Sequence, residues 1–83
     1  MAAITTEYRY GVREEVVVVL AGVRAFDLER QNDVPEACLP AWTIATVTTQ
    51  FRLGADAAYL VEFRRHGAVC IAVVNERSIE GVA

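Results

Sequence analysis

The sequence contains no lysine, so its eight basic residues are all arginines, set against eleven acidic residues. We interpret the missing lysine as the codon bias of a GC-rich bacterial genome. The net charge of −3 provides no general basic face, which a protein that follows a phosphate backbone requires. Nucleic acid is therefore disfavoured as a partner, and the basic triplet Arg64-Arg65-His66 is expected to contact at best a small anion or an acidic patch.

Residues that carry catalysis or bind metals are scarce. His66 is the only histidine and Ser78 the only serine, and no Ser-His-Asp set is visible. The two cysteines, Cys38 and Cys70, lack the close Cys-x-x-Cys spacing of a zinc site. The acidic segment after residue 26 lacks the central glycine of a calcium loop, and no glycine-rich phosphate loop is present. We therefore expect a protein that is not an enzyme, with no catalytic residue, metal ion or cofactor.

Long hydrophobic segments are also missing. The longest apolar run covers residues 16–23, far short of the roughly 20 residues that cross a bilayer as a helix. The N-terminal residues are charged and lack the apolar core of a signal peptide. We expect a cytoplasmic protein with no membrane partner. In a reducing compartment Cys38 and Cys70 are expected as thiols, while a disulfide between them and a nucleophilic Cys38 stay open as alternatives.

The length of 83 residues suffices for one small domain. Because 54% of the residues are hydrophobic and 23% are charged, the chain is expected to fold rather than stay disordered. The β pattern begins at residue 15. We therefore assign residues 15–83 to a single domain and residues 1–14 to an N-terminal extension or an added strand.

Alternating and β-branched residues predict five or six short strands. The strongest β signal lies in residues 15–23, which are apolar on both faces and are expected to form a central strand. The cleanest alternation lies in residues 57–65, which place Glu62 on the outward face. Other strands are predicted at residues 4–10, 42–51, 68–75 and 81–83. The predicted core comprises Val17, Val19, Ile44, Val47, Tyr59, Val61, Phe63, Ile71 and Val73.

The connections predict the remaining features of the fold. Residues 25–41 read as a long charged loop, with one helical turn around residues 27–31 and with Phe26 and Leu28 pinned to the core. Gly54 and His66-Gly67 mark tight turns, and residues 76–80 mark a short helical turn. The predicted fold class is mainly β. It is a small SH3-like barrel of five to six strands, with a long first loop and a short helical turn near the C-terminus.

Several segments from residue 15 onward carry a resemblance to a known family. They are residues 15–20, Val34-Pro35-Glu36, Thr46-Val47, residues 58–63 with the sequence Ala-Tyr-Leu-Val-Glu-Phe, Gly67 and residues 71–74. In these segments the chain resembles a family of small bacterial domains of unknown function with an SH3-like barrel, a fold also found in the nitrile hydratase β-subunit. The family's two glycines before Thr-Val are replaced by Trp42 and Ala45. The resemblance implies the barrel fold and transfers no catalytic residue.

The long loop is the predicted binding site. Loops on rigid scaffolds carry recognition because they can vary without unfolding the core. The carboxylates of the loop are expected to steer a basic surface, and its aromatic residues are expected to supply the apolar anchor. The predicted partner-binding residues are Phe26, Asp27, Glu29, Asp33, Glu36 and Trp42.

The function predicted from these features is a non-enzymatic protein–protein interaction module. Within that class we expect a small accessory or regulatory subunit of a bacterial complex, whose partner is a larger protein with a basic surface. A toxin-neutralising or phage-encoded inhibitor protein is the first alternative, and a nucleic-acid-binding small barrel is the second. A second copy of the chain is a further candidate partner.

Overall fold

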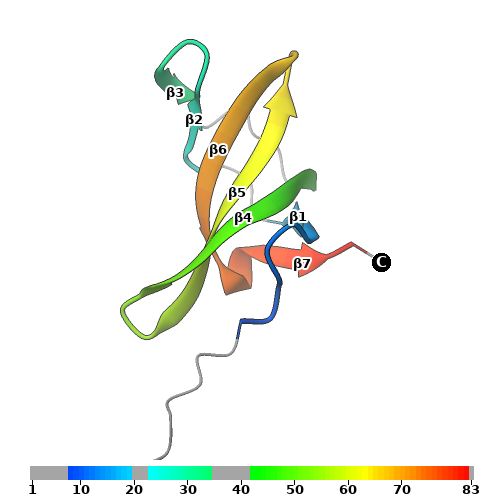
Figure 1. Cartoon of the computed structure of the whole chain (residues 1–83), viewed down its shortest axis with the longest axis vertical. Coiled ribbons are helices and arrows are strands. Elements are labelled where there is room, and N and C mark those ends of the chain that lie inside the picture. The colour runs from blue at the N-terminus through cyan, green and yellow to red at the C-terminus, as the bar shows by residue number, and fades with distance from the viewer. Residues whose placement is uncertain (1–7, 20–22, 35–41, 83) are drawn as a thin grey trace, which may run out of the picture.

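The computed structural model of the chain describes residues 8–19, 23–34 and 42–82. Most of these residues lie in β-strands, which confirms the mainly β fold class (Figure 1). None of them belongs to a helix that is long and apolar enough to cross a membrane. The elements are β1 (Glu15–Val18), β2 (Ala25–Asp27), β3 (Asn32–Val34), β4 (Thr43–Leu53), β5 (Asp56–Arg65), β6 (Ala68–Asn75), the 3₁₀ turn η2 (Glu76–Ser78) and β7 (Ile79–Gly81).

The strands form one antiparallel sheet in the order β3-β2-β6-β5-β4-β1-β7. The expectation of a closed barrel is wrong for the described residues, because the end strands β3 and β7 do not pair with each other. Closure was expected as a way to hide the edges of the sheet. Here the two edge strands have only three residues each and carry exposed charge, and both features discourage pairing with another chain.

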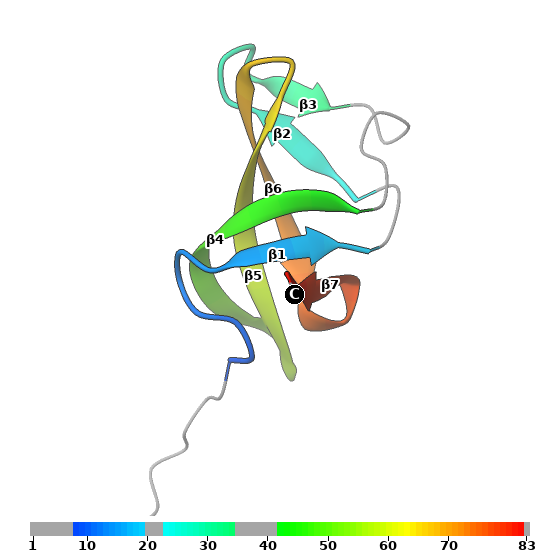
Figure 2. The ribbon, with the colours of Figure 1, turned by 90° about the vertical axis from the view of Figure 1, so that its right-hand side faces the viewer.

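The sheet bends sharply, so that its two halves enclose the core. The register of β4 against β5 shifts between Val47 and Thr49, and such a bulge bends the strand that contains it. Figure 2 shows β1 and β4 crossing β5 and β6 at a steep angle. A strand that bends at a bulge can take part in two layers of sheet that pack on each other with their strands nearly at right angles. The side chains on the concave side of the bent sheet therefore meet one another and form the core.

The two tight turns are confirmed. Arg65 pairs with Ala68, so His66 and Gly67 form a two-residue loop, and both have positive φ, at 52° and 79°. This is the pattern of a type I′ turn, whose twist matches that of the flanking strands. Gly54, with φ of 62°, opens the other two-residue loop between β4 and β5.

The core confirms the predicted faces of β5 and corrects those of other strands. Tyr59, Val61 and Phe63 are buried as predicted, and so is Val47. Elsewhere the prediction chose the wrong face. Val17, Val19 and Ile71 are half-buried, while Ile44 and Val73 are exposed by 57% and 49%. Alternation cannot assign a face where both faces are apolar. The buried residues there are Val16 and Val18 in β1, Ala45 in β4 and Cys70, Ala72 and Val74 in β6.

The long loop contains regular structure. Its first part is the hairpin β2–β3, joined by residues 28–31, which form a turn and not the predicted helical turn. The hairpin contacts the core through the buried Ala25 and Val34. Phe26, half-buried, and Leu28, 45% exposed, do not pin it as predicted. The reason is the pairing of β2 with β6, which turns every second residue of β2 away from the core.

Residues 8–10, the described part of the predicted strand at residues 4–10, pack on the core and do not form a strand. Residues 4–7 lie outside the described part of the chain, and residues 8–10 have no strand partner there. Tyr8 and Tyr10 meet the ring of Tyr59 edge-on, with ring centroids 6.0 Å and 5.6 Å away. The amide of Gln50 donates a 2.7 Å hydrogen bond to the backbone oxygen of Tyr10. Aromatic packing and backbone hydrogen bonds thus attach this segment to the sheet.

Candidate functional site

The convex face of the sheet carries one row of four residues that combines apolar and acidic side chains. Asp33 of β3 pairs with Phe26 of β2, Phe26 pairs with Ile71 of β6, and Ile71 pairs with Glu62 of β5. Residues that pair in this way project on the same side of a sheet. Phe26 and Ile71 are half-buried, while Asp33 and Glu62 are exposed. The row therefore consists of two apolar residues between two accessible carboxylates.

Apolar residues continue along the convex face on both sides of this row. Val73 pairs with Leu60 in the next row, and Val69 lies on the same face of β6 in the row before. Leu28 donates its backbone N–H to the oxygen of Val69 and is 45% exposed. We define the convex band as Phe26, Leu28, Leu60, Val69, Ile71 and Val73.

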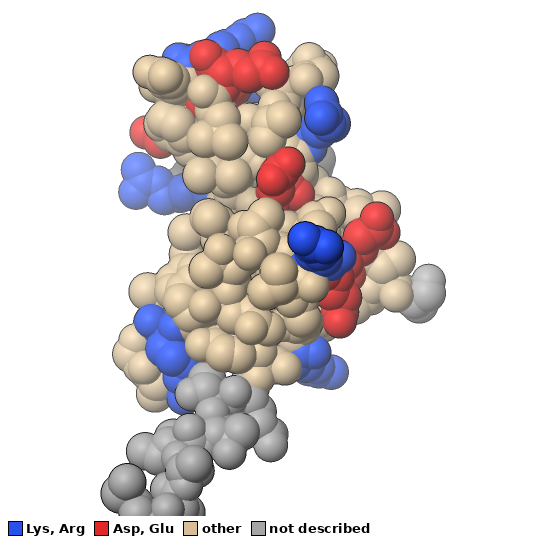
Figure 3. All heavy atoms as spheres, in the orientation of Figure 1, with Lys and Arg blue, Asp and Glu red and all other residues tan. Residues whose placement is uncertain are grey.

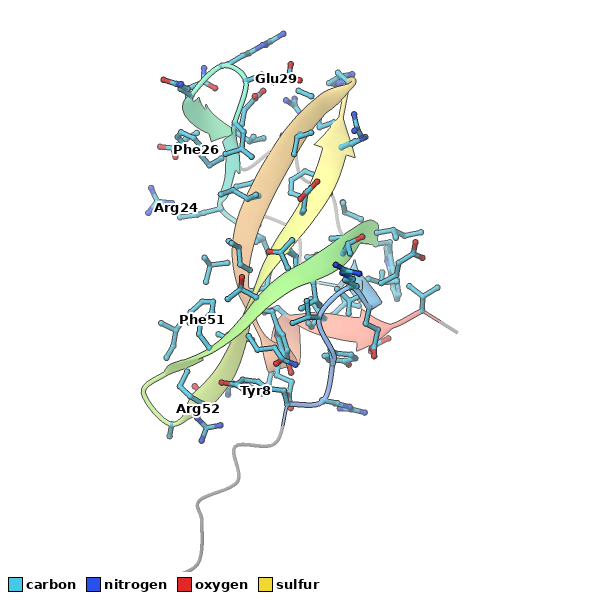
Figure 4. The ribbon with its side chains drawn as sticks, viewed as in Figure 1. Tyr8, Arg24, Phe26, Glu29, Phe51 and Arg52 are labelled. Carbon is cyan, nitrogen blue, oxygen red and sulfur yellow. The ribbon has the colours of Figure 1, made fainter. Side chains whose placement is uncertain are left out.

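The convex band includes a hollow. A pocket of about 470 Å³ lies where β2 and β6 diverge, and Phe26, Leu60, Ile71 and Val73 line it together with Arg24 and Asp33. Figure 4 shows Arg24, Phe26 and Phe51 on the same side of the sheet, from β4 at one end to the β2–β3 hairpin at the other. A concave apolar surface with a few polar groups at its margin is the usual form of a binding site.

Charged residues surround the convex band and do not neutralise one another. Arg24 and Arg64 are exposed, like the two carboxylates of the row. Among the residues that the structure describes, no ion pair holds Asp33 or Glu62, and the pair Arg77–Asp56 lies elsewhere. Figure 3 shows uncharged atoms over much of the same view, with most charged side chains toward its margins. We call Arg24, Asp33, Glu62 and Arg64 the rim of the convex band. The charges of the rim are available to a partner.

The structure divides the predicted partner-binding residues among different places. Phe26 and Asp33 belong to the row on the convex face, and Glu29 lies exposed in the turn of the β2–β3 hairpin (Figure 4). Glu36 lies outside the described residues. The remaining two, Asp27 and Trp42, are in surroundings of other kinds.

Asp27 is a structural residue and not an exposed charge. It is 5% exposed, and its Oδ1 accepts hydrogen bonds from the backbone N–H groups of Glu29 and Arg30, at 2.9 Å and 3.0 Å. This is an Asx turn, in which a carboxylate replaces a backbone acceptor and fixes the following turn. Asp27 therefore shapes the hairpin that presents Phe26 and Asp33.

Trp42 is highly accessible and lies apart from the acidic hairpin. The residue is 69% exposed, and it precedes β4 with a positive φ of 72°. The backbone N–H of Trp42 donates a hydrogen bond to the backbone oxygen of Val18, the last residue of β1. This bond holds Trp42, which has the left-handed backbone conformation, beside the end of β1. Ile44, two residues later, is 57% exposed. Figures 1 and 2 both place the start of β4 beside β1 and away from the hairpin tips.

The two hairpin tips lie at the same end of the molecule. Figures 1 and 2 both show the tip of β2–β3 beside the tip of β5–β6. A small polar pocket joins them, lined by Arg30 and Asp33 from one hairpin and Arg65 from the other. The basic triplet Arg64-Arg65-His66 and the β2–β3 hairpin, which carries Glu29 and Asp33, thus form one surface of mixed charge. A phosphate backbone would meet carboxylates there as well as guanidinium groups.

The described residues hold no evident reaction centre. Cys70 is a free, buried thiol, and burial raises its pKa above the ordinary value, with the charge of Asp27 acting in the same direction. A thiol with a raised pKa is a poor nucleophile at neutral pH. No group of three or more His, Cys, Asp or Glu side chains that could hold a metal ion occurs within residues 8–19, 23–34 and 42–82. Cys38 lies outside the described residues.

Several residues of the convex band were missed because they were assigned to the core or to no site. Ile71 and Val73 were predicted as core, and Leu60 and Val69 were assigned to no site. One sequence signal could have found them. The strand at residues 68–75 is apolar on both faces, and the sequence contains no long helical pattern that would cover the second face. Such a strand leaves an apolar face exposed unless another part of the chain or another protein covers it.

Comparisons of the chain with protein-family models, with curated proteins and with solved structures find no match. The resemblance to the small bacterial SH3-like family therefore stays an expectation. Function has to be inferred from the geometry of the convex face and of the surfaces around it.

Proposed function

We propose that the protein is a non-enzymatic protein–protein interaction module, a small cytoplasmic accessory or regulatory subunit of a bacterial complex. The observation that supports this proposal is the convex band, which exposes apolar side chains from three adjacent strands. Single exposed apolar residues are common on protein surfaces, but contiguous apolar patches rimmed by polar residues mark interaction sites. Covering each side chain of this kind contributes up to about 1.5–3 kcal/mol.

The rim supports a protein partner over other ligands. Apolar centres surrounded by charged rims are the usual anatomy of protein interfaces. The exposed carboxylates of Asp33 and Glu62 would repel nucleic acid and would attract a basic protein surface. Glu29 on the same hairpin would add to this field. Trp42 and Ile44, on the other half of the sheet, offer a second anchor for a partner large enough to reach both.

A toxin-neutralising or phage-encoded inhibitor protein would use the same surface, so the identity of the partner decides between these roles. We would place a photoreactive phenylalanine analogue at Val73 in the full chain and irradiate the native cell. Val12, which is 52% exposed and precedes β1, is a matched control for Val73, which is 49% exposed.

The expected result is a discrete crosslinked protein from position 73 and none from position 12. A crosslink to the chain itself would show a homo-oligomer and would contradict the proposed accessory role. The absence of any product from position 73 would remove the convex band as the interface.

A further inference from the structure

The convex band is wide enough to bind one α-helix. Three strand spacings of about 4.8 Å separate Asp33 on β3 from Glu62 on β5, a distance of roughly 14 Å along the row. An α-helix with its side chains is about 10–12 Å wide. A helix that lies along β6, over Phe26 and Ile71, would therefore fit between the two carboxylates.

The length of the band sets the length of that helix. The rows of the band from Val69 to Val73 span four residue steps of β6, which at about 3.4 Å per step is roughly 14 Å. At 1.5 Å per residue, a helical segment of about nine residues covers the same distance. Its apolar residues would recur at i, i+3, i+4 and i+7 to contact the band.

Resting on the proposed function, we propose that the partner presents a basic amphipathic α-helix, which lies along β6 with its apolar stripe on the convex band. Lysine or arginine side chains on both flanks of the helix would bind Asp33 on one side and Glu62 on the other. Long basic side chains suit this place because their apolar stems cover hydrophobic surface while their charged ends reach the rim.

The two arginines of the rim limit where those basic residues lie. Arg64 pairs with Val69, in the row next to the Asp33–Glu62 row on the side of the hairpin tips. Arg24 is two residues before Phe26, in the row next to the Asp33–Glu62 row on the other side. The carboxylates thus occupy the middle of the band, and the guanidinium groups occupy its two ends. Basic residues are expected at the centre of the helix, with neutral or acidic residues toward its ends.

The charges also argue against a second copy of this chain as the occupant. Two convex bands facing each other would bring four carboxylates, from Asp33 and Glu62 of each copy, into the middle of one interface, while the guanidinium groups of Arg24 and Arg64 would lie toward its ends. Like charges within an interface oppose association. The part of the chain that the structure describes contains no α-helix to offer. The helix therefore belongs to a different protein.

The test uses the full chain and two synthetic probes of about 14 residues, both with a leucine stripe at helical spacing. One probe carries lysines on both flanks at its centre, and the other carries glutamates at the same positions. Fluorescence anisotropy measures the affinity of each probe, and circular dichroism measures the helix formed on binding. The Asp33→Asn and Glu62→Gln double variant removes both charges without changing side-chain size, and Val12→Glu is the control.

The lysine probe is expected to become helical and to bind at least about tenfold more tightly than the glutamate probe. The double variant should reduce that preference by about fivefold, while Val12→Glu should leave it unchanged. Equal affinity of the two probes, or a preference that survives the double variant, would overturn the helical partner. If a partner protein is crosslinked from position 73 but either of these two results is found, the proposal of an interaction module is kept and only the helical partner is rejected. The two proposals can therefore be tested separately. A protein dimer that Val73→Glu dissociates would also overturn the helical partner.

Discussion

The hydroxyl of Tyr59 donates a 2.6 Å hydrogen bond to Oε2 of Glu76, which joins the middle of the sheet to the 3₁₀ turn η2. The same carboxylate oxygen accepts the backbone N–H of Arg9 at 3.3 Å, and the Tyr59 hydroxyl accepts the backbone N–H of Tyr10 at 3.3 Å. These bonds connect three segments that are distant in the sequence. They hold η2 and the N-terminal segment in place around one side chain.

This relationship predicts a loss of stability at alkaline pH. Burial, assisted by the hydrogen bond to Glu76, raises the pKa of Tyr59 from 10.0 to about 12. A raised pKa means that its contribution to stability is complete below pH 10 and is lost as the pH rises toward 12, because the unfolded chain ionises first. Urea unfolding across this range should show that loss in the wild type. It should be much smaller in Tyr59→Phe, whereas Tyr8→Phe, which keeps the bond, should retain it.

A pair of neighbouring valines tests the register of β6. Val74 is 3% exposed and Val73 is 49% exposed, so their side chains lie on opposite faces. Val74→Ala should lower the free energy of unfolding by about 2 kcal/mol, and Val73→Ala by less than about 1 kcal/mol. Denaturant unfolding of both variants checks this. Equal losses would mean that the convex face of β6 is as well packed as the core.

Phe63 tests the core of β5. It is 5% exposed and packs among the buried residues of the sheet. Phe63→Ala should cost about 3–5 kcal/mol, which is enough to unfold most molecules of a domain of this size. Thermal unfolding followed by circular dichroism measures the change. A melting temperature equal to that of the wild type would place Phe63 outside the core.

Asp27 and Asp33 should respond differently to substitution, although both were predicted as binding residues. Asp27→Ala removes the acceptor of two backbone hydrogen bonds and should cost about 1–2 kcal/mol. Asp33→Ala, on an exposed side chain, should change stability by less than about 0.5 kcal/mol. Chemical denaturation separates the two effects, and similar losses would contradict the Asx turn at Asp27.

Trp42 is the only tryptophan and reports on its own exposure. With 69% of the residue accessible, its fluorescence should be red-shifted and readily quenched by acrylamide in the folded protein. A blue-shifted, protected emission would contradict its placement before β4. If a partner covers Trp42 as well as the convex band, adding that partner should reduce the quenching.

The sequence predicted the strands and turns better than it predicted the faces. The turn at His66-Gly67 and the bounds of β6 were predictable because turn residues and β-branched runs act locally. The faces of β1 and β6 were not, because a strand apolar on both sides satisfies either register. The buried position of Phe63 was predicted correctly because the opposite register of the strand would place the charged Glu62 and Arg64 in the core.

The candidate site was only partly predictable for a related reason. Phe26 and Asp33 were identified as residues of a charged loop, but their neighbours Ile71 and Glu62 come from strands about 30 to 45 residues later. Only the pairing of β2 with β6 brings the four into one row. The pairing depends on the bend of the whole sheet, which local sequence patterns do not specify.

The central claim is that the convex band binds a partner protein. The direct test is isothermal titration calorimetry of the photocrosslinked partner, once purified, against wild type, Val73→Glu and Val12→Glu. Both substitutions place one carboxylate on a half-exposed valine, so net charge is matched. We predict that Val73→Glu weakens binding by at least about tenfold, as expected for a charge buried in an apolar interface, and that Val12→Glu binds like the wild type. Unchanged affinity for Val73→Glu, or equal weakening by both variants, would contradict the claim.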